Sequence, residues 1–268
     1  MTLVFVWWNA RGIGNKETQF KGFLGDEGAI YGGISEPMTY KQGRELSDGV
    51  YRWDAGTECG PTETGGKPYG GRGVFIDKTK TKSSIIRSGK YTLWHRIELQ
   101  GEHGHMVAGT GYFPKAQDTI GQAEANAELL SGLQHFLGLG SHVAFGGDLN
   151  AHLGANGDLC DIDNAGRMLL ATAKATGMEI VNMMDDKCTG GPSRVQVRLE
   201  DIQQSTIDYV LCSRSLCPHV ASLRIDDRQM GSDHKPLVLT LNGLPPIKPK
   251  REMAREVWDI SDIPLPDI

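Results

Sequence analysis

The chain has 268 residues, a formal net charge of −5 and 35 glycines, and a length sufficient for one large domain or two small ones. A hydrophobic fraction of 39% and a charged fraction of 23% are ordinary for a globular protein, so we expect disorder only at the ends. The negative charge argues against binding nucleic acid by overall electrostatics, because phosphate contacts come from Lys and Arg. Any contact with DNA must therefore be local.

The first residues and the cysteines lead us to expect an intracellular protein. No apolar run approaches the roughly 20 residues of a membrane span, and the first residues lack the charged leader of a signal peptide. Five cysteines show neither a C-x-x-C motif nor metal-ligand spacing with histidine: Cys59, Cys160, Cys188, Cys212 and Cys217. We therefore expect reduced thiols in a nuclear or cytoplasmic protein that is not secreted and binds no membrane. His152 is interpreted as a surface-loop residue.

Short runs rich in β-branched and aromatic residues predict a series of strands that end in polar residues. The first runs from Thr2 to Trp8 and places Asn9 at its carboxyl end. The other expected strands, in chain order, cover 30–36, 73–77, 91–99, 106–112, 143–148, 180–183, 207–212 and 237–241.

Two helices are expected among these strands. The first covers 122–137, where leucines and Phe136 recur at helical spacing. The second covers 164–176, with Asp163 or Asn164 as its N-cap and Gly177 just past its end. Helices alternating with many strands predict an α/β protein.

Two polar segments, 37–73 and 190–204, are expected to be long loops and are candidates for substrate contact. The second carries Arg194 and Arg198, which are candidates for phosphate contacts. From Gly243 onward, proline and basic residues become frequent. We therefore predict one domain over residues 1–242 and a linker-like tail over residues 243–268.

Several predicted strands lead into a carboxylate, an amide or a histidine. These residues are Asn9, Glu36, Asp148, Asn150, Asp208, Asp233 and His234. Side chains at strand ends can converge, and oxygen donors of this kind suit Mg²⁺, which prefers a few carboxylates, water and substrate phosphate. Zinc fits this set less well.

The local patterns pair some of these residues. Asp148 and Asn150 alternate, which places both on one side of extended backbone. Asp208 lies in an otherwise apolar strand, which is costly unless its carboxylate is paired or hydrogen-bonded. His234, beside Asp233 and just before the last strand, is the expected partner of Asp208.

Six short motifs occur in order along the chain. They are W-N-A-R-G at 8–12, S-E-P at 35–37, G-Y-F-P at 111–114, G-D-L-N at 147–150, S-T-I-D-Y-V at 205–210 and S-D-H-K-P at 232–236. Together they resemble the endonuclease/exonuclease/phosphatase superfamily over residues 1–241. Within it, the opening motif, residues 164–182 and S-T-I-D-Y-V are most similar to endonuclease domains of non-LTR retrotransposons. The basic tail resembles the linker that precedes reverse transcriptase.

The resemblance implies a four-layer α/β sandwich of the deoxyribonuclease I type, with two packed mixed β-sheets flanked by helices. The site would lie at one rim. It also implies a Mg²⁺ cofactor, replaceable by Mn²⁺, held by Glu36, Asp233 and Asn9. Arg11, Arg194 and Arg198 would contact DNA phosphates.

The same resemblance implies roles in the reaction. Asn9 and Asn150 would position the scissile phosphate, and Tyr112 would form a hydrogen bond to it. Asp148 would orient or deprotonate the attacking water. His234, held by Asp208, would contact the phosphate or assist proton transfer, and either Asp148 or His234 is the general base.

The implied reaction is cleavage of duplex DNA to leave 3′-hydroxyl and 5′-phosphate ends, with a reverse transcriptase domain of the same polyprotein as a candidate partner. The alternative is a cellular abasic-site repair endonuclease of the same fold. Arg11 argues mildly against that alternative, because such enzymes tend to carry an acidic residue there. A lipid or inositol-phosphate phosphatase and a catalytically silent binding module are further alternatives.

Overall fold

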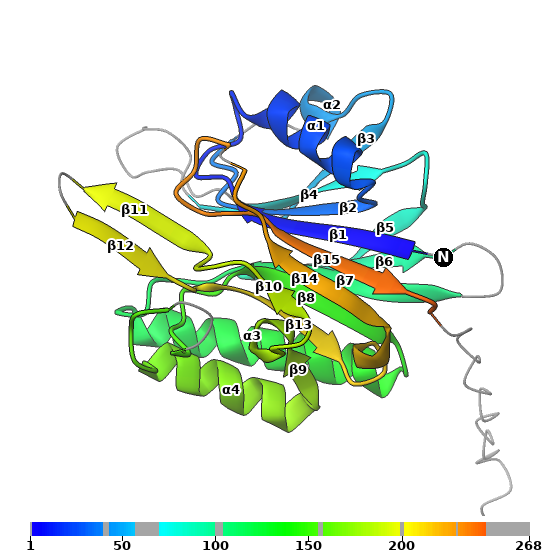
Figure 1. The fold of residues 1–268 in the computed structure, drawn as a ribbon. Coiled ribbons are helices and arrows are strands. Elements are labelled where there is room, and N and C mark those ends of the chain that lie inside the picture. Colours follow the sequence, from blue (N-terminus) through cyan, green and yellow to red (C-terminus); the bar gives the residue numbers. More distant parts are fainter. Residues whose placement is uncertain are drawn as a thin grey trace, which may run out of the picture.

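The computed structural model describes residues 2–39, 43–56, 70–99, 104–154, 158–198, 201–228 and 230–244. These residues form four layers, in which two β-sheets pack face to face and helices cover the outer face of each sheet (Figure 1). The architecture confirms the predicted α/β sandwich of two mixed sheets. Most of the predicted tail, residues 245–268, lies outside the described residues.

The first sheet has seven strands in the order β10-β14-β15-β1-β2-β4-β3. Their bounds are β1 Thr2–Asn9, β2 Tyr31–Ser35, β3 Tyr51–Ala55, β4 Arg72–Asp77, β10 Cys188–Thr189, β14 Val220–Ile225 and β15 Leu237–Asn242. Strand β1 is central, parallel to β2 and antiparallel to β15. This pairing puts the carboxyl ends of β1 and β2 at one edge of the sheet.

The second sheet has six strands in the order β5-β6-β7-β8-β13-β9. Their bounds are β5 Ser83–Ser88, β6 Thr92–Glu98, β7 His105–Tyr112, β8 His142–Asp148, β9 Met178–Ile180 and β13 Asp208–Ser213. Strands β7 and β8 are parallel, and β13 runs antiparallel to β8. The carboxyl ends of β7 and β8 therefore meet the amino end of β13.

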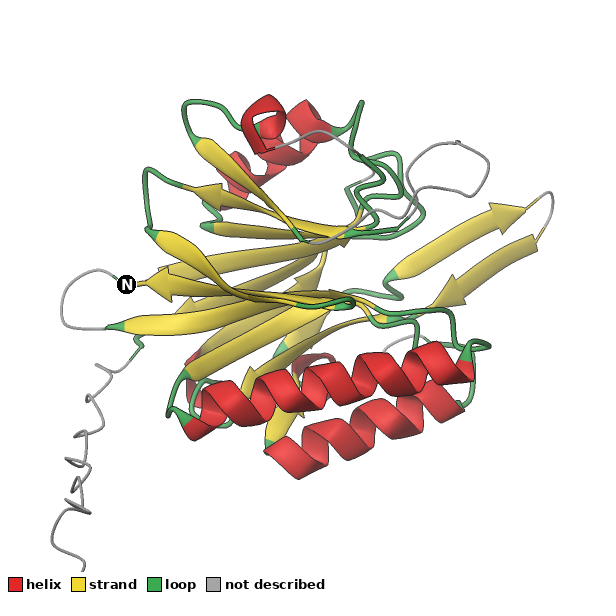
Figure 2. Ribbon diagram, turned by 180° about the vertical axis from the view of Figure 1, so that it is seen from behind, coloured by secondary structure: helices red, strands yellow, loops and turns green. Residues whose placement is uncertain are grey.

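The helices divide between the two outer faces (Figures 1 and 2). Their bounds are α1 Glu17–Glu27, α2 Gly43–Leu46, α3 Thr119–Gly138 and α4 Asn164–Thr176. Helices α3 and α4 cover the six-stranded sheet, whereas α1 and α2 lie over the seven-stranded sheet. Among the described residues, no helix combines the length and apolar character needed to cross a membrane.

Three apolar clusters fill the spaces between the layers. Phe5 and Trp7 of β1 lie in the cluster between the two sheets. Trp94 and Phe136 belong to the cluster under α3 and α4, and Phe20 belongs to the cluster under α1. Burial of apolar surface on both faces of each sheet explains why most strands read as continuous apolar runs rather than alternating patterns.

The predicted helix at 164–176 is confirmed together with its ends. The Asp163 side chain accepts a hydrogen bond from the Gly166 backbone N–H, which makes Asp163 the N-cap, and Gly177 follows the last helical residue. Helix α1 was not predicted. Its sequence contains Gly22 and Gly25, and glycine weakens a helical signal.

Three other expectations were wrong. The strand expected at 180–183 ends at Ile180, and Val181–Met183 is a 3-10 turn because the Asn182 side chain bonds the backbone of Asp208 and Val210 in the neighbouring strand. The expected loop at 37–73 contains α2, β3 and the start of β4. The expected loop at 190–204 forms a hairpin of β11 Arg194–Arg198 and β12 Asp201–Ser205, which projects from the body of the molecule (Figure 1).

The two sheets approach each other closely at one rim. The Trp7 indole packs so near β8 that a Cβ at Gly146 would lie 2.6 Å from the ring. The next residue, Gly147, has φ +142, and a Cβ there would overlap the backbone carbonyl of Gly111 in β7. Both glycines are therefore required by the close packing beside Asp148.

The Gly147→Ala variant tests this constraint. We expect a loss of about 2–4 kcal/mol in the free energy of unfolding, because the new Cβ meets both a backbone clash and an unfavourable φ. The matched control is Gly138→Ala at the end of α3, where nothing lies within 4 Å of the added Cβ. Urea denaturation of both variants measures the difference, and equal stabilities would contradict the packing described.

Candidate active site

Three strands of the six-stranded sheet bring three polar side chains into one row at this rim. In the strand register, Tyr112 of β7 lies beside Asp148 of β8, and Asp148 lies beside Asp208 of β13. Asp148 and Asp208 are buried, with exposed fractions of 2% and 1%. Sheet pairing therefore juxtaposes residues that are 36 and 60 positions apart in sequence.

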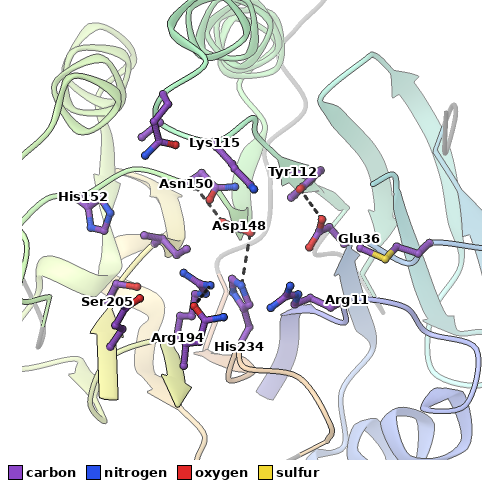
Figure 3. Close-up of a pocket in the computed structure, with 16 residues that line it drawn as sticks. Arg11, Glu36, Tyr112, Lys115, Asp148, Asn150, His152, Arg194, Ser205 and His234 are labelled. Carbon is purple, nitrogen blue, oxygen red and sulfur yellow. Dashed lines mark hydrogen bonds and ion pairs between the residues drawn. The ribbon is translucent and has the colours of Figure 1, made fainter. Parts of the chain in front are cut away.

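The seven-stranded sheet presents a second row opposite the first. Asn9 at the end of β1 pairs with Ser35 at the end of β2, and Glu36 follows directly. The Asn9 amide donates to Glu36 Oε2 at 3.0 Å and to Asp148 Oδ2 at 2.7 Å. The Tyr112 hydroxyl donates to Glu36 Oε1 at 2.6 Å. The Asn9 amide thus connects carboxylates carried by different sheets, and the Tyr112 hydroxyl of one sheet bonds Glu36 of the other (Figure 3).

His234 lies between two carboxylates. Its Nδ1 is 2.9 Å from Asp208 Oδ2, and its Nε2 is 4.0 Å from Asp148 Oδ2. The Ser193 hydroxyl donates to the same Asp208 oxygen at 2.7 Å, and the Trp8 indole N–H donates to the His234 carbonyl at 3.0 Å. The imidazole is therefore held in one orientation, with Nε2 directed toward Asp148.

Burial and neighbouring charges together leave the pKa of both Asp148 and His234 raised. Burial, together with the nearby Asp208 carboxylate, raises the pKa of Asp148 to about 7. Burial alone would lower the pKa of His234, but the carboxylates of Asp208, Asp148 and Asp233 outweigh that effect and raise it to about 9. At neutral pH the imidazole is therefore protonated, and Asp148 is close to its midpoint.

Two arginines neutralise Asp233. Arg11 Nη1 lies 2.9 Å from both oxygens of the carboxylate, and Arg194 Nε lies 2.9 Å from Oδ2. Burial would raise the pKa of Asp233, but the hydrogen bond from Arg11 and the charges of His234 and both arginines lower it overall. Asp233 therefore joins the segment after β1 to the base of the projecting hairpin.

These side chains surround a pocket of about 400 Å³. Its lining comes from both sheets, the hairpin and the segment before α3, and comprises Arg11, Glu36, Met38, Tyr112, Lys115, Ala116, Gln117, Asp148, Asn150, His152, Arg194, Gln196, Gln203, Ser205, Ile207 and His234. Figure 3 shows the Lys115 side chain directed into the pocket between Tyr112 and Asn150. Among the described lining residues, Lys115 is a cation without an ion-pair partner, whereas both arginines are paired with Asp233.

Backbone strain is concentrated at the same place. Among the described residues, the non-glycine residues with positive φ are Arg11, Glu36, Met38 and Asn150, with values from 43 to 49. All four line the pocket. Such conformations cost on the order of 1 kcal/mol or more each and persist where the surrounding structure imposes them, which is typical of functional sites.

The structure brings most of the predicted site residues together around this pocket. The Arg198 side chain lies outside the described residues, so its predicted phosphate contact is not placed. Sequence reasoning missed three residues, namely Lys115, His152 and Ser193. Lys115 and His152 follow the G-Y-F-P and G-D-L-N motifs closely, which was an available signal, but nothing local marks Ser193 as the partner of Asp208.

The predicted metal ligands differ in the groups that their side chains already bond. Glu36 is bonded to neutral donors, the Asn9 amide and the Tyr112 hydroxyl, which suits a carboxylate that also binds a cation. Asn9 presents its N–H group to the carboxylates, while its oxygen accepts from the Arg11 backbone N–H at 3.0 Å. Because an amide N–H cannot ligate a metal, this orientation argues against Asn9 as a ligand. The carboxylate of Asp233 is already occupied by two arginines.

Comparison with protein families and solved structures agrees with this fold. Residues 110–238 match the family described as endonuclease-reverse transcriptase. The endonuclease domain of TRAS1, a telomere-specific non-LTR retrotransposon, superposes with a TM-score of 0.71 and 17% identity, covering 91% of this chain and 100% of that chain. AP endonuclease LMAP from Leishmania major gives a TM-score of 0.73 and 12% identity, covering 90% and 87%.

A phosphatase shares the fold as well. Mannosyl-6-phosphatase Bt3783 from Bacteroides thetaiotaomicron gives a TM-score of 0.63 and 12% identity, covering 88% of this chain and 98% of that chain. A search of curated proteins found no sequence match. At these identities the structural likenesses establish the fold, and the fold alone does not separate nuclease from phosphatase.

The Asp148→Asn variant tests the environment of the buried acid. Because the folded-state pKa of Asp148 is raised from 3.8 to about 7, the folded protein keeps a proton there that the unfolded chain has lost across this window. Ionisation of the acid therefore lowers the free energy of unfolding progressively as pH rises from about 4 to 7. Above that range this contribution no longer changes with pH. An asparagine, neutral at every pH, removes this cost.

We expect metal-free Asp148→Asn protein to be more stable than wild type by ~1 to 3 kcal/mol at pH 8, with little difference at pH 4. Urea denaturation at the two pH values in EDTA measures this. The opposite result, a variant less stable at pH 8, would show that ionised Asp148 stabilises the fold.

Proposed function

We propose a DNA endonuclease function from one premise, namely that the chain is homologous to the nuclease and phosphatase hydrolases of the endonuclease/exonuclease/phosphatase superfamily. The proposed enzyme hydrolyses phosphodiester bonds in duplex DNA and leaves 3′-hydroxyl and 5′-phosphate ends. The match to the endonuclease-reverse transcriptase family supports nicking of target DNA for retrotransposon integration. A 3′-hydroxyl end would prime a reverse transcriptase in the same polyprotein.

One observation carries this proposal. Asp148, buried at the end of β8, faces His234 Nε2 across 4.0 Å at the wall of an open pocket whose rim carries cationic side chains. An acid near its midpoint beside a protonated imidazole is an arrangement that can take a proton from water and donate a hydrogen bond to a phosphate oxygen.

In the proposed mechanism, Asp148 orients the attacking water and accepts its proton. His234 remains protonated, because the Asp208 carboxylate, which accepts a hydrogen bond from Ser193, lies against its Nδ1, and its Nε2–H binds a phosphate oxygen. Asn150 positions the phosphate from the strained turn after β8. Glu36 would hold Mg²⁺, or Mn²⁺ in its place. When bound, the cation offsets negative charge on the phosphate.

The remaining polar groups are given supporting roles. Asn9 fixes Glu36 and Asp148 relative to each other, and Tyr112 holds the second Glu36 oxygen until a phosphate competes for its hydroxyl. We propose that Asp233 acts mainly by directing Arg11 and Arg194 toward DNA phosphates, since both guanidinium groups retain free N–H donors for an anion.

Nicking of supercoiled plasmid tests the function. Wild type and His234→Ala are assayed with Mg²⁺ and with EDTA, beside His105→Ala as a histidine control at the far end of β7. We expect Mg²⁺-dependent relaxation that falls by about 10²-fold or more in His234→Ala and is unchanged in the control. Equal nicking by His234→Ala and wild type would contradict the proposed site.

The same preparation is offered two other substrates, a matched duplex with one abasic site and a phosphomonoester. Cleavage confined to the abasic duplex would assign the chain to repair, the function named for the Leishmania major relative. Phosphate release without plasmid nicking would assign it to the phosphatases. Ligation of the nicked plasmid by DNA ligase without further treatment checks the predicted 3′-hydroxyl and 5′-phosphate ends.

We propose that Lys115, which forms no ion pair within the described residues, contacts a DNA phosphate, and Lys115→Gln tests this contact. Removing this cation should raise KM for duplex DNA by about tenfold at moderate salt and reduce the slope of log K against log salt by ~1, because one phosphate contact is lost. The control is Lys82→Gln, at the opposite end of the sheet. An unchanged salt slope would show that Lys115 makes no contact with the backbone of DNA.

A further inference from the structure

A second group of metal-ligating side chains lies beside the pocket, in the segment that joins β8 to α4. It consists of His152, Asp158 and Cys160, which can each direct one ligand atom so that all three atoms lie within 4.8 Å of one another. Asp158 and Cys160 lie outside the pocket lining described above, whereas the His152 ring forms part of the pocket wall (Figure 3). The group combines an imidazole nitrogen, a carboxylate oxygen and a thiol.

The ends of this segment are fixed by reciprocal bonds. The His152 backbone N–H donates to Asp163 Oδ1 at 3.2 Å, and the Asp163 N–H donates to the His152 carbonyl at 3.2 Å. Asp163 is also the N-cap of α4. The segment is therefore closed at its base, and His152 is anchored to a helix rather than free in a loop.

Within the closed segment, the carboxylate of Asp158 occupies the centre of the group. Its side chain is fully buried, and its oxygens lie 3.0 and 3.1 Å from His152 Nδ1. The Cys160 backbone N–H donates to Asp158 Oδ1 at 3.2 Å, which turns the chain so that the thiol faces the same region. Burial of a carboxylate is costly unless a cation or several donors compensate it.

The charge around the group is negative. Partial burial and the nearby carboxylates of Asp158, Asp163 and Asp161 raise the pKa of the Cys160 thiol. Within the described part of the chain, no lysine or arginine forms an ion pair with any of these acids, and the ion-pair partner of Asp158 is His152. A divalent cation would compensate this charge.

We propose that His152, Asp158 and Cys160 bind a zinc ion at this position. A nitrogen, oxygen and thiolate donor set suits zinc and is a poor match for Mg²⁺, which prefers oxygen ligands alone. On binding, Cys160 loses its proton to solvent and coordinates as the thiolate, and water fills the remaining position. The ion would fix the His152 ring and with it this wall of the pocket, independently of the cation proposed at Glu36.

Titration of the full chain with zinc tests the proposal. Protein stripped with EDTA is dialysed into excess Mg²⁺ and titrated with Zn²⁺ by calorimetry and with Co²⁺ by absorbance. We expect one zinc per chain under these conditions, and a Co²⁺ spectrum that contains a thiolate charge-transfer band. Cys160→Ser should abolish that band and weaken zinc binding by about tenfold or more, and His152→Gln should weaken it similarly.

The controls separate this site from the proposed catalytic one. Cys217→Ser, which removes a half-buried thiol elsewhere, should leave the band and the zinc affinity unchanged, as should Glu36→Gln. Absence of saturable zinc binding in Mg²⁺-containing buffer, or binding that survives both Cys160→Ser and His152→Gln, would overturn the proposal. Plasmid nicking plays no part in this readout, so failure of the endonuclease assignment and failure of the zinc assignment are distinguishable.

Discussion

The close approach of the two sheets at one rim is the constraint on which the site depends. The Trp7 indole fits against Gly146, and the Ser35 hydroxyl donates to the Gly111 carbonyl across the sheet interface at 2.8 Å. Gly147 has a positive φ, and the Gly111 carbonyl leaves no room for a side chain there. Without this approach, the carboxyl end of β1 could not reach the carboxyl end of β8, and Asn9 could not contact Asp148.

That approach also creates the electrostatics of the site. Asp148 is buried between Asp208 and Glu36. Among the described residues, the Asn9 amide is the neutral group that donates both to Asp148 of one sheet and to Glu36 of the other. Burial and like charge destabilise the ionised acid, which is the property that a proton acceptor near neutral pH requires.

The projecting hairpin is attached to the same centre. Its first strand bonds the segment that carries the histidine: the Val195 N–H donates to the Asp233 carbonyl at 2.8 Å, and the Lys235 N–H donates to the Ser193 carbonyl at 2.7 Å. Ser193 in turn bonds Asp208. A displacement of the hairpin would therefore be transmitted to His234 through these backbone hydrogen bonds and the Ser193 hydroxyl.

Local periodicity and chain order predicted the α/β class, most strands and the set of polar residues at strand ends, and they narrowed the N-cap of α4 to Asp163 or Asn164. Only the tertiary structure decided that Tyr112, Asp148 and Asp208 form one row, that Ser193 supports Asp208 and that Asp233 pairs with two arginines. Sheet register and the turns of distant segments set those contacts. The hairpin was mistaken for a loop for a different reason: its two strands form a sheet of their own and are largely polar and partly or fully solvent-exposed, so they lack the apolar signal of the other strands.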